Sequence, residues 1–256
     1  MSYTVIIPAR YGSSRLPAKP LADIDGRPMI AHVVDRASRS GAARVVVATD
    51  DQRIQTAVSP LGVETLMTHP DHPSGTDRLQ QAAALLQLAD DDIVVNVQGD
   101  EPLIPPAVID QVAANLAANP DCGMATLCEP IQSVAQFLEP GAVKVVSSVS
   151  GRALYFSRAP IPWPRDAFAK NKDQLPDALI PMRHIGIYAY RVRFLNAFIG
   201  WPMHPLEAHE CLEQLRALAN DVAIHVAPAC EPIPAGVDTA ADLERVRAMV
   251  AAGAIA

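Results

Sequence analysis

Short apolar runs alternate with amphipathic segments along the first half of the chain. Strands covered on both faces are predicted by nearly continuous, β-branched apolar runs at residues 3–9, 44–50 and 92–99. Helices are predicted where apolar residues recur every three or four positions, at residues 28–41, 76–90 and 105–120, with a further helix start at 50–62. The alternating order predicts an α/β fold with a mostly parallel, Rossmann-like sheet.

The second half has a different pattern. Residues 143–166 predict a hairpin that turns near Ser150 and Gly151, and a proline-rich loop follows up to Pro181. Further elements are a strand at 184–191, one helix at 205–221 with Cys211, Leu212, Leu215 and Ala219 on its apolar face, a strand at 222–228 and a closing helix capped by Thr239. We interpret residues 1–256 as a single domain with an antiparallel segment inserted at about 140–200.

Composition narrows the class of protein. The 256 residues carry a formal net charge of −7, which argues against nucleic-acid binding, and half of them are apolar. No basic leader and no membrane-length apolar run is present, so we expect a cytoplasmic protein without membrane insertion. The cysteines form no CxxC pair and are expected to be buried thiols: Cys122, Cys128, Cys211 and Cys230.

The loop after the first strand, "ARYGSSRLPAK", concentrates positive charge on an acidic chain. Such a loop lies at the carboxyl end of a strand, where α/β sheets bind ligands. Its glycine lets the backbone approach an anion, and its serines and cations suit a triphosphate: Arg10, Gly12, Ser13, Ser14, Arg15 and Lys19. It matches neither a Walker A motif nor GxGxxG. The alternative is a solvated basic loop.

Acidic side chains follow the third strand in "NVQGDEPLI". Mg²⁺ takes one or two carboxylates plus phosphate oxygens, so Asp100 is a candidate metal ligand beside the cationic loop. The alternative is an acidic pair that caps the next helix, which Pro102 favours for Glu101. Asp238 precedes the last helix and could cap it, but Thr239 can cap it instead and leave Asp238 for metal.

Other polar residues point to a second ligand. In "HPSGTDRL", Gly75 and Thr76 open a helix whose free N–H groups could bind a ligand, with Thr76 as the expected N-cap, although an ordinary capped helix would look the same. Arg158, Arg165, His184 and Tyr188 suit an anionic, hydroxylated substrate, while a lone histidine beside a strand is more often structural.

Taken together, the motifs resemble the 3-deoxy-manno-octulosonate (Kdo) cytidylyltransferase family, the CMP-Kdo synthetases of Gram-negative bacteria. The resemblance runs in order through "IPARYGSSRLPAKPL", "HPSGTDRL", "NVQGDEPLI", "LYFSRAPIPW", "RHIGIYAYR", "LEQLRAL" and "GVDTAADLERVR". It implies a nucleotide-diphospho-sugar-transferase-like fold and a homodimer with the antiparallel segment at its interface. It also implies transfer of CMP from CTP to Kdo with Mg²⁺, for lipopolysaccharide biosynthesis.

The resemblance also implies roles for individual residues. The catalytic set is Arg10, Arg15, Lys19, Asp100 and Asp238, with the last two as metal ligands. The CTP-binding set is Arg10, Ser13, Ser14, Arg15, Lys19, Ser74, Gly75 and Asp100, and the Kdo-binding set is Arg78, Gln98, Arg158, Arg165, His184, Tyr188, Glu213 and Gln214. Alternatives are a cytidylyltransferase for 8-amino-Kdo or a sialic-acid-like compound, or a non-catalytic nucleotide-binding protein.

Overall fold

The computed structural model describes residues 2–12 and 16–253. Its sheet is built around β1 (Thr4–Ala9), which pairs in parallel with β4 (Arg44–Thr49) on one side and β6 (Ile93–Asn96) on the other. β5 (Glu64–Met67) continues the parallel part beyond β4. The predicted mostly parallel, doubly covered sheet is confirmed for this half, because Val5 and Ile7 pack into one apolar cluster and Ile6 into the other.

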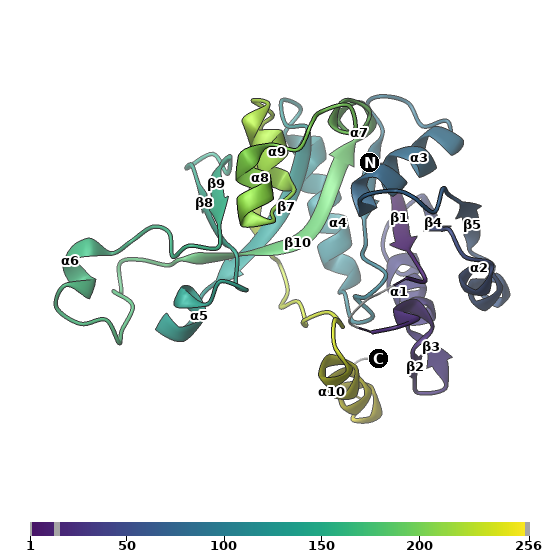
Figure 1. The fold of residues 1–256 in the computed structure, drawn as a ribbon, viewed down its shortest axis with the longest axis horizontal. Coiled ribbons are helices and arrows are strands. Elements are labelled where there is room, and N and C mark those ends of the chain that lie inside the picture. Colours follow the sequence, from purple (N-terminus) through teal and green to yellow (C-terminus); the bar gives the residue numbers. More distant parts are fainter. Residues whose placement is uncertain (1, 13–15, 254–256) are drawn as a thin grey trace.

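The other half of the sheet is mixed in direction. β10 (Met182–Arg191) lies between β6 and β7 (Met124–Pro130) and is antiparallel to both, and β11 (Ile224–Pro228) runs parallel to β7. The order is therefore β11-β7-β10-β6-β1-β4-β5 (Figure 1). One long strand from the second half of the chain thus joins the parallel strands β5, β4, β1 and β6 to β7 and β11.

Helices cover both faces of this sheet. α1 (Met29–Ser38) and α4 (Pro106–Ala118) contribute to the cluster around Val5 and Ile7, and α3 (Gly75–Leu85) and α7 (Val192–Phe198) to the cluster around Ile6. α10 (Ala240–Ala251) packs in a separate cluster with Ile24 of the small strand β2 (Asp23–Ile24), which pairs with β3 (Arg27–Pro28). Shorter elements are α2 (Gln52–Val58), η1 (Lys19–Leu21) and η2 (Ser59–Leu61).

An arm formed by residues 131–181 projects from the sheet (Figure 1). It contains the hairpin of β8 (Lys144–Ser147) and β9 (Ala153–Ser157), together with α5 (Val134–Leu138) and α6 (Arg165–Phe168). β8 pairs with the start of β10, and Gly151 has a φ of 77° in the turn, as the predicted hairpin requires.

The single helix expected at 205–221 is wrong. The chain forms α8 (Pro205–Glu210) and α9 (Gln214–Ala219), separated by Cys211 in the left-handed region at φ 50°. The break lets the buried Glu207 accept a hydrogen bond from Arg216 Nε at 2.7 Å. In one continuous helix, the nine-residue spacing would place the two backbones roughly 13 Å apart along the helix axis. Cys211 and Ala219 are exposed rather than packed on an apolar face.

The cysteine prediction holds for only part of the set. Cys122 and Cys128 are buried, whereas Cys211 and Cys230 are exposed in the loops after α8 and β11. Within the described residues, we find no helix with the length and apolar character needed to cross a bilayer.

Candidate active site

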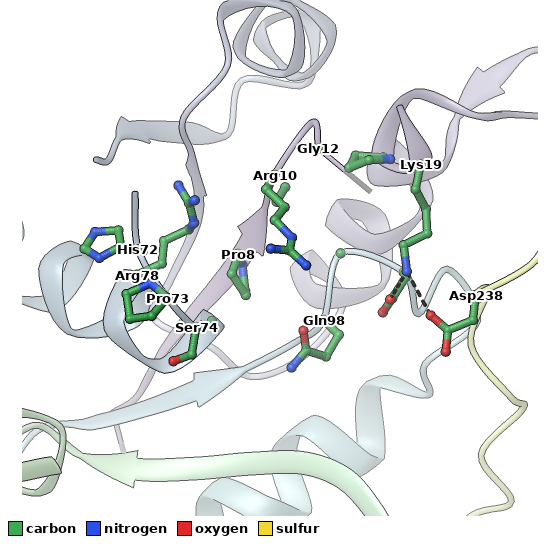
Figure 2. Close-up of a pocket in the computed structure, with 15 residues that line it drawn as sticks. Pro8, Arg10, Gly12, Lys19, His72, Pro73, Ser74, Arg78, Gln98 and Asp238 are labelled. Atoms are coloured by element: carbon green, nitrogen blue, oxygen red, sulfur yellow. Dashed lines mark hydrogen bonds and ion pairs between the residues drawn. The ribbon is translucent and has the colours of Figure 1, made fainter. Parts of the chain in front are cut away.

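A pocket of about 300 Å³ opens at the carboxyl ends of β1 and β6 (Figure 2). The described residues that line it come from the opening loop, the start of α3, the loop after β6 and the segment before α10. They are Pro8, Ala9, Arg10, Gly12, Lys19, Pro20, His72, Pro73, Ser74, Gly75, Arg78, Gln98, Gly99, Asp100 and Asp238. We call this space the first pocket. It brings together the predicted phosphate loop and the predicted metal carboxylates.

Lys19 joins the two carboxylates expected to bind metal. Its Nζ atom lies 2.5 Å from Asp100 Oδ2 and 3.1 Å from Asp238 Oδ1 (Figure 2). Asp238 is not the helix cap, because Thr239 and Asp242 form the capping box of α10. Nowhere in the described ranges do three or more His, Cys, Asp or Glu side chains gather as a metal cluster.

The opening loop reaches the first pocket through Arg10, Gly12 and Lys19. The other predicted phosphate-binding residues, Ser13, Ser14 and Arg15, lie outside the described residues. Gly99 forms the opposite wall, and a Cβ atom there would lie 2.9 Å from the Pro8 carbonyl oxygen. Glycine is therefore required where the ends of β1 and β6 approach each other.

The start of α3 corrects one prediction. Ser74, not Thr76, is the N-cap: Asp77 N–H donates to Ser74 Oγ at 3.3 Å, and Ser74 Oγ donates to Asp77 Oδ2 at 2.6 Å. The helix therefore begins two residues earlier than a cap at Thr76 would allow, and Ser74 and Gly75 line the first pocket. Thr76 instead donates from Oγ1 to Glu213 Oε2 at 2.6 Å, which ties α3 to the start of α9.

Arg78, expected among the sugar residues, lines the first pocket. Its side chain is buried, with Nη2 donating to Asp50 Oδ2 at 2.9 Å and Nη1 donating to the Thr68 hydroxyl. Two anchors at the ends of neighbouring strands hold this guanidinium rigidly. Arg78 is therefore a fixed part of the wall of the first pocket.

A second pocket of about 330 Å³ adjoins the first at Gln98, which lines both. It gathers four of the predicted sugar residues on the side of the sheet where α7 and α9 pack. Its lining consists of Thr76, Gln98, Glu101, Met124, Gly186, Tyr188, Tyr190, Phe194, Phe198, Glu213 and Gln214. Polar groups form one part of the wall, and Met124, Phe194 and Phe198 form an apolar part.

Burial raises the pKa of two side chains that line the second pocket. Desolvation, with a further contribution from the Asp100 charge, raises the pKa of Glu101 to about 8. Burial, together with the neighbouring Tyr190 and Glu213, raises the pKa of Tyr188 well above its ordinary value. Sequence reasoning did not assign Glu101, Thr76 or Tyr190 to this site. The available signal was that Glu101 directly follows Asp100, the predicted metal ligand, at the end of a buried strand.

Three predicted sugar residues line neither pocket. Arg158 is held by Glu210, whose backbone carbonyl accepts from Arg158 Nε at 2.6 Å and whose carboxylate accepts from Arg158 N at 2.8 Å. Arg165 is exposed on α6 in the arm and pairs with Asp166.

His184, the third, packs edge-on against Phe156 and lies beside Tyr188, with Nε2 3.0 Å from Thr126 Oγ1. Burial, with a smaller effect of Arg183, lowers its pKa to about 3. The ring is therefore neutral at physiological pH and supports the wall behind Tyr188, one of the lining residues.

Comparison with known proteins agrees with this geometry. A family model described as "Cytidylyltransferase" matches residues 4–224, which makes the chain a member of the cytidylyltransferase class. More narrowly, the chain belongs to the 3-deoxy-manno-octulosonate cytidylyltransferase family. The protein of that name from Cellvibrio japonicus is 61% identical over 254 residues, covering 99% of this chain and 100% of that protein. The one from Alcanivorax borkumensis is 60% identical over 250 residues, covering 98% and 99%.

Solved structures give the same result. The structure of a CMP:2-keto-3-deoxy-manno-octonic acid synthetase complexed with CTP has a TM-score of 0.88 and 44% identity, covering 98% of this chain and 99% of that chain. A cytidylyltransferase from Leptospira borgpetersenii has a TM-score of 0.62 at 16% identity, covering 98% and 87%, which is a likeness of fold alone. The predicted nucleotidyltransferase fold class is confirmed.

Proposed function

We propose that this protein transfers the CMP group of CTP to the 2-hydroxyl group of Kdo, releasing pyrophosphate. The family membership, the named relatives and the CTP complex of the similar synthetase support this reaction. One structural observation carries it furthest: a pocket with cations and two carboxylates adjoins a polar pocket, and Gln98 lines both. Two substrates bound in these pockets would meet at their common wall.

The carboxylates of Asp100 and Asp238 fit a divalent cation, for which we propose Mg²⁺. Both already converge on one positive charge, the Lys19 ammonium, and both line the pocket that would hold the phosphates. Mg²⁺ prefers one or two carboxylates completed by phosphate oxygens and water. When bound there, the ion would supply charge neutralisation at the phosphates and a lower pKa for a coordinated hydroxyl group.

The remaining roles fall to side chains and backbone. Arg10 and Lys19, with Arg15 as a prediction from the sequence, neutralise the phosphates and the departing pyrophosphate. The N-terminus of α3, at Ser74 and Gly75, offers free N–H groups to an anion. In the second pocket, Gln98, Tyr188 and Gln214 bind and orient the sugar acid. Catalysis then consists of alignment and charge neutralisation, without a covalent intermediate.

We further propose a cytoplasmic homodimer assembled through the arm. β9 pairs only with β8 among the described strands, and Leu154 on β9 is 62% exposed. Leu138, Trp163 and Ile180 add exposed apolar surface to the same arm. Apolar surface of this kind marks protein interfaces. Arg165 lies on α6 of this arm (Figure 1) and lines neither pocket, so it could act on a sugar acid only at a partner's site or after movement of the arm.

A pyrophosphate-release assay tests the reaction. We expect release with CTP and Kdo together, little release when Kdo is omitted, and much slower turnover with UTP, ATP or GTP. Preferred turnover of 8-amino-Kdo or a sialic acid would instead identify another acceptor. Nucleotide binding without any turnover would identify a non-catalytic protein, which the presence of Lys19, Asp100 and Asp238 argues against.

A further inference from the structure

Two consecutive acids after β6 line different pockets. Asp100 lines the first pocket with Lys19 and Asp238, whereas Glu101 lines the second pocket with Tyr188 and Gln214. The backbone here forms a tight turn, in which Glu101 N–H donates to the Gln98 carbonyl at 3.1 Å. A single peptide unit therefore separates the carboxylate on the nucleotide side from the one on the acceptor side.

Glu101 has an unused hydrogen-bonding atom. Its Oε2 is fully buried and has no hydrogen-bond partner among the described residues. Gln214, only 6% exposed, has an Nε2 atom in the same condition, and both side chains line the second pocket. Buried polar atoms are rarely left unpaired, because each loses the hydrogen bonds that it made with water. A ligand that supplies both a donor and an acceptor would satisfy both atoms.

A sugar acid needs a cationic partner for its carboxylate, and this bears on which end of the molecule the second pocket can hold. Its described lining residues include the carboxyl groups of Glu101 and Glu213 but no lysine or arginine. A carboxylate ligand would be unfavourable there, whereas hydroxyl groups can both donate and accept. The acid group and the 2-hydroxyl of Kdo lie on adjacent carbons, so both belong near Gln98 and the first pocket. The polyol end then extends into the second pocket.

We propose that Glu101 is an acceptor-binding residue, whose carboxyl group forms a hydrogen bond with a hydroxyl group of the polyol end of the sugar acid. This inference rests on the proposed function and adds a specific contact to it. A purely structural role is the competing explanation, because the Glu101 side chain also passes close to Gly236, where a Cβ atom would lie 3.6 Å from Glu101 Cγ. A structural role would change stability, or both substrate affinities together.

The test compares Glu101→Ala and Glu101→Gln with the wild-type enzyme, and Glu64→Gln on the exposed ion pair with Arg44 as matched control. The KM values for Kdo and CTP, kcat and the thermal midpoint are measured for each protein. We expect Glu101→Ala to raise the KM for Kdo about tenfold and the KM for CTP less than twofold, because one hydrogen bond to a buried acid is lost. Glu101→Gln, which can still accept and donate, should stay within about threefold of wild type.

A second measurement does not depend on turnover. Calorimetric titration with Kdo analogues that each lack one hydroxyl group, in the presence of a non-hydrolysable CTP analogue, should identify one deletion that weakens binding to wild type and not to E101A. An unchanged KM for Kdo in E101A, equal rises in both KM values, or equal losses for every analogue in both proteins would overturn the proposal. A wild-type enzyme with no activity on Kdo would overturn the proposed function and this inference with it.

Discussion

Lys19 neutralises Asp100 directly, with Nζ 2.5 Å from Oδ2, and the lysine side chain is only 15% exposed. The same ammonium reaches Asp238 at 3.1 Å. The cation therefore holds the two carboxylates in one place before any nucleotide arrives, and it lines the pocket that would receive the phosphates.

Replacing Lys19 should show separately what its charge does for the phosphates and what it does for the two carboxylates. We expect Lys19→Met to lower kcat about 100-fold, because a preorganised charge on the phosphates is lost. The same change should tighten Mn²⁺ binding to the nucleotide-free enzyme, because two carboxylates lose their counter-charge. Steady-state kinetics and Mn²⁺ titration by electron paramagnetic resonance check the pair of outcomes. Lys172→Met, in the exposed arm, is the control. Unchanged kcat would contradict the role of Lys19.

Arg78 provides a test of the boundary between the two pockets. Arg78→Lys should raise the KM for CTP about tenfold, because lysine cannot reproduce the fixed fork that Asp50 and Thr68 anchor. Asp50→Asn should have the same effect to a smaller degree. The KM for Kdo should change less than twofold in both variants. If the KM for Kdo rises instead, Arg78 belongs to the sugar site, as the resemblance of the sequence implied.

Substitutions of Ser74 and Thr76, two hydroxyl residues at the start of α3, should have different effects. Ser74→Ala removes the N-cap and should lower the free energy of unfolding by about 1 kcal/mol. Thr76→Val removes the hydrogen bond to Glu213 and should chiefly raise the KM for Kdo, because Glu213 then loses its anchor in the second pocket. Urea denaturation and steady-state kinetics distinguish the two. An equal loss of stability in both would contradict the assignment of the cap.

Protonation of His184 predicts a pH dependence of stability. Its pKa falls from 6.5 in a free side chain to about 3 in the folded protein, so the unfolded chain takes up the proton first as the pH falls. The free energy of unfolding should therefore decrease between about pH 6.5 and pH 3. His184→Gln should make the decrease between pH 7 and pH 5 smaller, as measured by urea denaturation. His209→Gln, at an exposed position, should retain the wild-type slope.

Charge placed on the arm should dissociate the proposed dimer. Leu154→Glu and Ile180→Glu introduce carboxylates at apolar positions that are 62% and 66% exposed in the single chain. We expect each to yield a monomer in light scattering, because a carboxylate is costly to bury in an interface. Leu85→Glu, at a 52% exposed position on α3, should leave the assembly unchanged. A monomeric wild-type protein would contradict the proposed assembly.

The sequence predicted the strands that carry the first pocket because β1, β4 and β6 are nearly continuous apolar runs. Two strands of the main sheet, β5 and β7, escaped prediction, as did the two-residue strands β2 and β3. β5 has only four residues, all partly exposed, and β7 mixes apolar residues with Thr126 and Cys128, without clear alternation. The place of β10 between β6 and β7 was also missed, because pairing with strands about 60 and 90 residues away leaves no local signal.

The candidate site likewise contains some residues that the sequence could place and others that depend on contacts distant in the chain. Lys19 and Asp100 could be brought together from the sequence, because the carboxyl ends of adjacent strands converge in an α/β sheet. Asp238 was a candidate for the same site because Thr239 can cap the last helix in its place, and its position beside Lys19 could not be predicted from the sheet. The place of Arg78 in the first pocket and the neutral state of His184 could not be predicted. They depend on contacts with Asp50 and Phe156, which lie far away in the chain. Glu101 was missed because its turn explains an acidic residue as well as a binding role does.

The position of Gln98 in the wall of both pockets bears on inhibitor design. A compound that joins a cytidine nucleotide to a polyhydroxylated acid needs no spacer beyond the bridging phosphate, because the two spaces touch. Once the nucleotide portion is seated, the other half meets its pocket at a high effective concentration, and the two affinities combine without new contacts. The common wall that aligns two reactants for transfer would thus serve equally well to retain a single molecule that imitates them both.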